Sequence, residues 1–251
     1  MKYVMDLHTH TMASGHGFST LAENIEKAKE VGLKVLGYSE HAASMPGGPH
    51  PFYIDSLKVV PRKYGKLALL CGIEANIMDM EGHIDVSEHT ILNNLDYVIA
   101  SLHGPCIEPG TMQENTKALL GAMKNPYVKI IGHPDDERYP LDYERLVSGA
   151  MEAGVILEVN NTSIHPNSVR QGARENIMKM LEICKRYRCP IIMGTDSHIC
   201  HQIGDFSRAA SLLELVDFPS ELVMNTDTLN LSKIVINDKV AARVFEDLAE
   251  E

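Results

Sequence analysis

The sequence predicts an α/β fold in which seven parallel strands and their crossover helices close into a distorted (β/α)7 barrel. The chain has 251 residues, a length common for a single α/β barrel. Short apolar, strand-like runs alternate with helix-like segments, and no linker, low-complexity tract or repeat divides the chain. Polar side chains gather at the ends of the strand-like runs, where such folds place their chemistry, and this favours closure over an open sheet. We therefore expect one domain over residues 1–251.

The first half of the chain is expected to contain four strands. Thr20 lies three residues before Glu23, which predicts a capping box at the start of the first helix, and Gly32 ends that helix. Pro61 is expected to kink the second helix. In chain order the expected elements are strand 3–8, helix 19–31, strand 34–39, broken helix 55–66, strand 67–74, an irregular hairpin 76–85 around Gly82, and strand 97–102.

The second half is expected to contain three further strands, each with a helix beside it in the sequence. Pro126 follows the first of these helices, and Gly154 ends the next. The expected elements are helix 111–124, strand 128–132, helix 142–153, strand 155–160, helix 171–187, strand 190–195, helix 207–216, one short element after residue 221, and helix 239–250.

Composition and charge exclude several classes of protein. The chain carries 23 Lys+Arg and 34 Asp+Glu, a net charge of −11, which disfavours nucleic-acid or anionic-membrane partners because both are polyanions. No apolar run is long enough to cross a membrane, and Asp6 interrupts any signal-peptide core. The five cysteines show no paired spacing. Reduced thiols in a cytoplasmic protein are the simplest interpretation.

Side chains that can bind a metal stand at six of the seven predicted strand ends. Residues two apart on a strand point to the same face, so His8 with His10, and Asp196 with His198, can each grip one ion. The candidate metal ligands are His8, His10, His16, His41, Glu74, His103, His133, Asp196 and His198.

Imidazole and carboxylate without thiolate suit zinc, manganese or iron. A catalytic zinc takes about three protein ligands, so nine candidates indicate two or three ions, and Glu74 is the natural bridge between them. Asp6 could orient a ring nitrogen of the ligand pair, or could simply be a buried carboxylate that accepts backbone N–H bonds. Glu40, beside His41, is expected to point away from the ligands as a solvated or structural group.

These motifs resemble the PHP (polymerase and histidinol phosphatase) family over about residues 3–205. Segments 72–77, 195–198 and 216–219 are similar to its YcdX-type probable phosphatases. The resemblance implies a TIM-like, distorted seven-stranded barrel with a trinuclear, usually zinc, site at the C-terminal ends of the strands. It assigns His8, His10, Glu74 and Asp196 to one ion, His16, His41 and His198 to a second, and Glu74, His103 and His133 to a third. Glu40 departs from the family, which commonly has Asp at that position.

The function we expect is metal-dependent hydrolysis of a small phosphomonoester, with a metal-bound hydroxide as the nucleophile. Glu74, Asp196 and His198 are the residues expected to bear most directly on catalysis. Arg62, Arg138 and Arg170 follow predicted strands and are candidates for binding phosphate, although solvated surface roles are at least as common for arginines.

Three other functions stay open at this point. Amidohydrolase-type C–N hydrolases also begin a barrel with His-x-His, but His16 and His41 exceed their usual binuclear ligand set. A phosphodiesterase or nuclease is disfavoured by the net charge of −11. A non-catalytic metal-binding module is disfavoured because ligands on rigid strand ends suit a fixed, open site.

Overall fold

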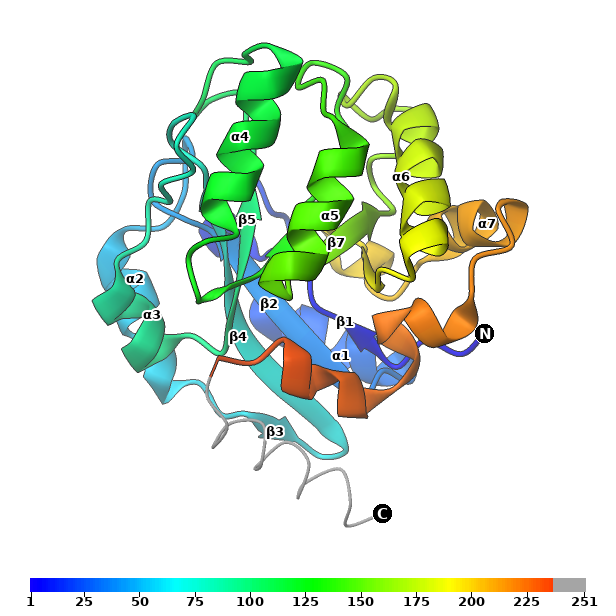
Figure 1. Cartoon of the computed structure of the whole chain (residues 1–251). Coiled ribbons are helices and arrows are strands. Elements are labelled where there is room, and N and C mark those ends of the chain that lie inside the picture. The colour runs from blue at the N-terminus through cyan, green and yellow to red at the C-terminus, as the bar shows by residue number, and fades with distance from the viewer. Residues whose placement is uncertain (237–251) are drawn as a thin grey trace.

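The computed structural model describes residues 1–236, so the helix expected over 239–250 lies outside the described residues. Its centre is a sheet of seven parallel strands, ordered β1-β2-β4-β5-β6-β7-β8 (Figure 1). The parallel strands are β1 (Met5–Asp6), β2 (Val35–His41), β4 (Leu67–Asn76), β5 (Tyr97–Ser101), β6 (Val128–Ile131), β7 (Ile156–Asn160) and β8 (Ile191–Gly194). The prediction of seven parallel strands is therefore confirmed, although β1 is reduced to two residues.

The sheet curves until its two edge strands nearly meet. At the C-terminal ends of β1 and β8, Thr9 bridges Ser197 in parallel, and Asp196 N–H donates to the His8 carbonyl at 2.7 Å. Near the other end of the seam, the Asn225 side chain bonds the main chains of Met5 and Met193. These contacts make the sheet a distorted, nearly closed barrel, as the sequence predicts.

Helices cover the outside of this barrel. Figure 1 shows α4, α5 and α6 side by side over the sheet, as expected for right-handed crossovers between neighbouring parallel strands. The helices are α1 (Leu21–Glu30), α2 (Pro51–Asp55), α3 (Glu88–Asn94), α4 (Met112–Ala122), α5 (Tyr143–Ala153), α6 (Ala173–Tyr187) and α7 (Ser207–Leu215). None of the helices in residues 1–236 combines the length and apolarity needed to cross a membrane.

Within the described part of the chain, two buried clusters form the core, one on each face of the curved sheet. The outer cluster packs the helices against strand residues such as Leu69 and Val98. The inner cluster fills the barrel with residues such as Leu70, Ile99 and Ile130. Glu74 pairs in register with Ile99, so its side chain belongs to the inner face and lies above this apolar filling.

Local signals placed most helix ends correctly. The predicted capping box at Thr20 and Glu23 is present, and Thr111 with Glu114 forms a second one at α4. Gly154 ends α5 in the left-handed conformation. The predicted hairpin around Gly82 is also confirmed, since Ile77 and Ile84 pair in antiparallel fashion.

The broken helix expected over 55–66 is wrong. The helix there, α2, begins earlier because His50 caps it and a proline occupies its first turn. After a 3-10 turn over Leu57–Val59, the chain forms β3 (Lys63–Tyr64), which pairs antiparallel with β4. Gly65, at a φ of +66°, makes the tight turn between these two strands. The short helix α3, capped by Ser87, was not predicted.

Candidate metal centre

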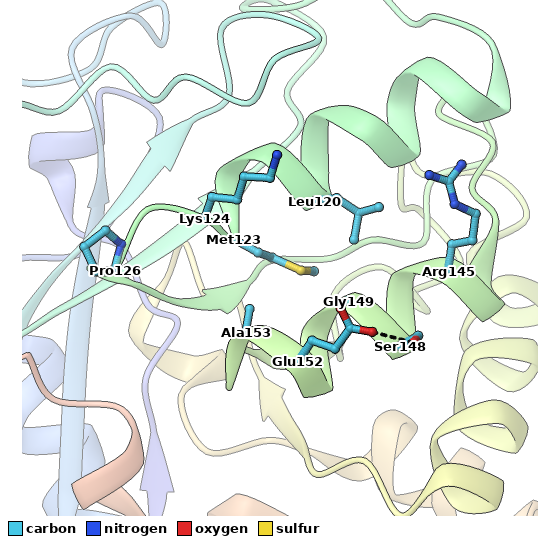
Figure 2. A pocket seen from close by; sticks show the side chains of 9 residues that line it. All are labelled: Leu120, Met123, Lys124, Pro126, Arg145, Ser148, Gly149, Glu152 and Ala153. Atoms are coloured by element: carbon cyan, nitrogen blue, oxygen red, sulfur yellow. Dashed lines mark hydrogen bonds between the residues drawn. The ribbon is translucent and has the colours of Figure 1, made fainter.

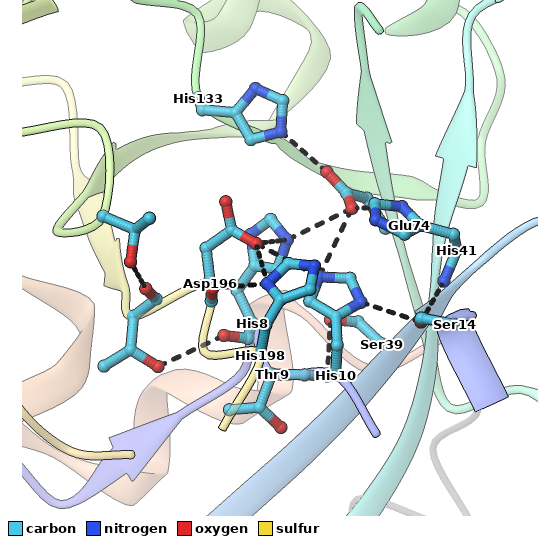
Figure 3. A network of polar contacts seen from close by, with 12 residues as sticks. His8, Thr9, His10, Ser14, Ser39, His41, Glu74, His133, Asp196 and His198 are labelled. Carbon is cyan, nitrogen blue, oxygen red and sulfur yellow. Dashed lines mark hydrogen bonds and ion pairs between the residues drawn. The ribbon is translucent and has the colours of Figure 1, made fainter. Parts of the chain in front are cut away.

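The nine predicted ligands meet at the C-terminal end of the barrel. Seven of them are buried, and the two at the open edge are His16 and His198. Figure 3 shows the rings of His8, His10 and His41 turned toward the carboxylates of Glu74 and Asp196. Because the carboxyl ends of parallel strands share one edge, residues far apart in the sequence converge here.

Glu74 lies at the centre of the cluster, with five imidazoles around its two oxygens. The first oxygen, Oε1, is 2.8 Å from His133 Nε2 and 3.1 Å from His103 Nε2. The second, Oε2, is 2.8 Å from His41 Nδ1. The Nε2 atoms of His8 and His10 lie 3.4 and 3.5 Å from the same Oε2. One carboxylate therefore touches ligands on both of its sides, which is the arrangement a bridging carboxylate requires.

Asp196 forms the second anionic point of the cluster. Its Oδ1 is 3.2 Å from His10 Nε2 and 3.6 Å from His8 Nε2. Its Oδ2 accepts a hydrogen bond from Arg170 Nη1 at 3.0 Å. Asp196 and His133 both adopt positive φ values, +51° and +28°. Such backbone conformations cost about 1–3 kcal/mol each and tend to occur at functional sites.

The open edge of the cluster is made of stacked rings. His10 and His198 stack with their centroids 4.4 Å apart, and His16 stacks on His198 at 4.6 Å. His16 Nε2 is also 3.2 Å from His41 Nε2. This edge is the part of the centre that solvent reaches.

The donor atoms fit a group of divalent cations. Within residues 1–236, four overlapping sets of three residues bring their ligand atoms within 4.8 Å of one another. These sets are His8, His10 and Asp196; His8, Glu74 and His133; His41, Glu74 and His103; and His10, His41 and His198. Buried atoms without a hydrogen bond point into the same space: His8 Nε2, His10 Nε2, His41 Nδ1, Glu74 Oε2 and His198 Nε2. Unpaired buried polar atoms are costly, and bound cations would satisfy them.

Burial and charge keep Glu74 and His10 in the form that binds metal. Burial raises the pKa of Glu74, but the nearby His103, His8 and His41 outweigh it and hold that pKa well below its usual value. Burial, together with the neighbouring His41 and His198, lowers the pKa of His10 well below its usual value. An ionised carboxylate and a neutral imidazole are the ligand forms.

Residues outside the predicted set orient the ligands from behind. Glu158 Oε1 lies 2.7 Å from His8 Nδ1, and Asn76 Oδ1 lies 2.7 Å from His103 Nδ1. Asp85 holds the Asn76 amide through its Oδ2 at 2.7 Å. Partners of this kind fix the tautomer of a metal-binding imidazole. Sequence reasoning missed Glu158, because β7 carries no histidine and the predicted site drew nothing from that strand.

The sequence leaves alternative roles for two carboxylates, Asp6 and Glu40, and their contacts decide between these roles. Asp6 makes no bond to a ligand ring; it accepts from Thr195 Oγ1 at 2.6 Å and from the Gly204 N–H at 3.1 Å. It is therefore the buried structural carboxylate of the two alternatives. Glu40 is not solvated, because it is fully buried and bonded to Thr11 and Ser14.

Of the three candidate arginines, Arg170 alone contacts a predicted metal ligand. Besides Asp196, its Nη1 reaches Ser163 Oγ at 3.1 Å. Arg62 instead pairs with Asp96 at 3.0 Å, beside the start of β4, and Arg138 pairs with Asp136. Arg170 is therefore the one candidate arginine of the three that lies beside the cluster.

A surface groove lies apart from this centre, between α4 and α5 on the outside of the barrel (Figure 2). Its lining includes Leu120, Met123 and Gly149, and its charged residues are Lys124, Arg145 and Glu152. None of the nine predicted ligands lines it.

Comparisons with known proteins agree with the fold. Residues 6–162 match the PHP domain. The chain is 49% identical over 227 residues to a probable phosphatase of Clostridium acetobutylicum, with 90% of this chain and 92% of that protein covered. It is 40% identical over 243 residues to a probable phosphatase of Acetivibrio thermocellus, with 97% and 99% covered.

A solved structure shares the barrel. It is histidinol phosphate phosphatase from Lactococcus lactis, in complex with zinc, L-histidinol and phosphate. The TM-score is 0.59 at 18% identity, and the match covers 86% of this chain and 95% of that one. At this identity the likeness concerns the fold.

Proposed function

Because the chain belongs to the PHP domain family, we propose that it is a metal-dependent phosphatase that hydrolyses small phosphomonoesters. The observation that carries the proposal is the buried Glu74 carboxylate with five imidazoles within 3.5 Å of its oxygens. The relatives of this chain in Clostridium acetobutylicum and Acetivibrio thermocellus are probable phosphatases, and the chain matches them over nearly their whole length.

The cluster is proposed to hold three ions, with zinc as the first choice and manganese or iron as alternatives. The proposed ligands are His8, His10, Glu74 and Asp196 for one ion, His16, His41 and His198 for a second, and Glu74, His103 and His133 for a third. One of the four convergent sets, His8 with His10 and Asp196, falls entirely within the first group, and each of the other three combines residues of two groups. The zinc in the structure of the Lactococcus lactis phosphatase supports the choice of metal.

Bound divalent ions would supply hydroxide near neutral pH and neutralise the phosphoryl oxygens during in-line displacement. The protein's own residues have separate tasks. Glu74 and Asp196 hold the positive charge in place, and His16 and His198 border the open edge through which a substrate enters. No serine or cysteine nucleophile is required.

Arg170 is proposed to bind the phosphate group. Its Nη1 bonds Asp196, which places a planar guanidinium beside the cluster, and its side chain is 16% exposed. Guanidinium binds phosphate through two parallel hydrogen bonds. Arg170→Lys should therefore raise KM more than it lowers kcat, while Arg188→Lys, an exposed arginine paired with Glu221, should change neither. Equal losses in a phosphate-release assay for the two variants would contradict this role.

The test of the function is phosphate release from a panel of small phosphomonoesters by metal-loaded protein. Release should stop after chelation and return on adding zinc or manganese. His10→Ala and Asp196→Ala should lose both metal and activity, whereas His89→Ala, which changes an exposed histidine on α3, should keep both. Full activity in chelated protein would exclude the metal mechanism. No release from fully loaded protein would exclude the phosphomonoester substrate, and phosphodiesters and C–N bonds would be tested next.

A further inference from the structure

The hydroxyl of Ser14 joins three groups in the wall of the metal centre. Its oxygen lies 2.5 Å from Glu40 Oε2, 3.1 Å from His10 Nδ1 and 3.1 Å from the backbone nitrogen of His41. Figure 3 shows Ser14 between the His10 ring and the main chain of His41. Ser14 and Glu40 are both fully buried, so water does not compete for these bonds.

The direction of each hydrogen bond follows from the chemistry of the partners. A serine hydroxyl has one proton to donate and two lone pairs that accept. A carboxylate only accepts, so the hydroxyl donates its proton to Glu40. A backbone N–H only donates, so His41 occupies one lone pair. The remaining lone pair faces His10 Nδ1, and a bond forms there only if that nitrogen carries the proton.

We infer that Glu40, acting through Ser14, is a positioning residue that keeps the proton of His10 on Nδ1 and leaves Nε2 free to bind a metal. His10 Nε2 is buried without a hydrogen bond and lies 3.2 Å from Asp196 Oδ1 and 3.5 Å from Glu74 Oε2. The inference rests on the metal centre proposed above. It gives a task to Glu40, which touches no metal-binding side chain itself.

Removing the carboxylate should reverse the relay. In Glu40→Leu the Ser14 hydroxyl loses its acceptor. The nearby atom that can accept its proton instead is His10 Nδ1, through the lone pair of an unprotonated nitrogen. The imidazole proton would then move to Nε2, which no longer binds a metal. Ser14→Ala removes the bond without forcing the wrong tautomer. Glu40→Leu should therefore be the more damaging change, and adding Ser14→Ala to it should restore function.

Glu40→Gln is the matched control for charge. Oε2 accepts from both the Thr11 N–H and the Ser14 hydroxyl, so the amide oxygen takes that position. The amide NH2 then faces Thr11 Oγ1, which has lone pairs to accept it. Ser14 keeps an acceptor although the negative charge is gone.

The first experiment reads the tautomer directly in metal-free protein, by side-chain ¹⁵N NMR of histidine, with His10→Gln used to assign the resonance. We expect the proton on Nδ1 in the wild type and in Glu40→Gln, and on Nε2 in Glu40→Leu. A wild-type proton on Nε2 would overturn the inference without any variant. This readout needs neither metal nor activity, so its failure is distinct from failure of the proposed phosphatase.

The second experiment measures zinc affinity by chelator competition, in variants shown to be folded by circular dichroism. Glu40→Leu should weaken binding by roughly 10–100-fold, the usual effect of losing a partner behind a ligand. Adding Ser14→Ala to Glu40→Leu should raise the zinc affinity again by about tenfold. If the double variant binds zinc no more tightly than Glu40→Leu does, the role of Glu40 is only structural. If Glu40→Gln binds zinc as weakly as Glu40→Leu does, only the negative charge of Glu40 matters for zinc binding. Either result overturns the relay.

Discussion

Glu158 contacts two of the proposed metal ligands, His8 and His133, with one carboxylate. Its Oε1 lies 2.7 Å from His8 Nδ1, and its Oε2 accepts from the His133 N–H at 2.7 Å and from Asn160 Nδ2 at 3.1 Å. Both oxygens therefore face donors. Unlike Glu40, Glu158 has no side on which an amide NH2 would be accepted.

Glu158→Gln should lower zinc affinity by about 10–100-fold, because the amide places an NH2 against either His8 or the His133 backbone. The measurement is zinc retention during dialysis against graded chelator. Glu152→Gln, an exposed change on α5, is the matched control and should retain zinc as the wild type does. Wild-type retention in Glu158→Gln would mean that the bond to His8 does not govern binding.

The spacing of residues along the chain explains which parts of the site could be predicted from the sequence. His8 with His10, and Asp196 with His198, are visible because strand geometry alone puts residues two apart on one face. Glu158 and His8 are 150 residues apart and meet only through the closed barrel. A buried glutamate on a strand carries no local signal of its partner. The convergence of the candidate ligands was thus predictable, and the residues that orient them were not.

At the scale of elements, the hairpin after β4 is fastened to α4 by two glycines. A Cβ on Gly82, at a φ of +87°, would lie 2.2 Å from the Ala122 nitrogen, and one on Gly121 would lie 2.0 Å from the Glu81 carbonyl oxygen. The hairpin carries Asp85, which holds Asn76 behind the metal centre. Close backbone packing therefore supports the orientation of a ligand from a distance.

Gly82→Ala should destabilise the fold more than Gly65→Ala, measured as the free energy of unfolding in urea. Gly65 also has a positive φ, +66°, but a Cβ there meets nothing within 4 Å. Its substitution isolates the conformational cost, about 1–2 kcal/mol. Gly82→Ala adds a backbone clash, so its total should reach about 3 kcal/mol or more. Similar losses for both would show that the hairpin shifts away from α4 without cost.

Elements were predictable where their signals are local. The capping boxes at Thr20 and Thr111 and the stop at Gly154 act within one helical turn, and all are present. The segment 55–66 was mispredicted because β3 exists only by pairing with β4. Arg62, beside that strand, is fixed by Asp96, a contact that spacing along the chain does not reveal.

At the scale of the whole molecule, Asn225 closes the barrel where β1 and β8 do not pair directly. Its Oδ1 accepts from the Met193 N–H at 2.7 Å, and its Nδ2 donates to the carbonyls of Met5 at 3.0 Å and Met193 at 2.8 Å. Its own carbonyl accepts from the Val4 N–H at 2.8 Å. One buried side chain thus replaces part of a missing strand ladder.

Asn225→Ala should lower the free energy of unfolding by about 3 kcal/mol, since three buried backbone groups lose their partners. Asn230→Ala is the matched control. Asn230 is half-buried and its side chain donates to the Met224 carbonyl at 3.1 Å, so the loss of this bond is expected to cost about 1 kcal/mol. Equal losses for the two variants would mean that the seam is held by other contacts.

The proposed ligands also lie on both sides of this seam, since His8 and His10 follow β1 while Asp196 and His198 follow β8. Bound ions would therefore tie the barrel closed at the end opposite Asn225. A ligand that binds only the folded state stabilises it by about 4 kcal/mol at a free concentration 1,000 times its Kd. For a chain of this size, about 2–4 °C of Tm is expected per kcal/mol. Chelation should thus lower the Tm by roughly 10 °C in calorimetry.

Asp196→Ala is the control that separates stabilisation by bound ions from a direct effect of the chelator on the protein. The variant loses a ligand next to the seam, so chelator should shift its Tm much less than that of the wild type. Added zinc should raise the wild-type Tm in proportion to the logarithm of its concentration. A wild-type Tm that stays constant after verified removal of metal would contradict closure by ions. It would leave Asn225 and the Thr9–Ser197 bridge as the contacts that close the barrel.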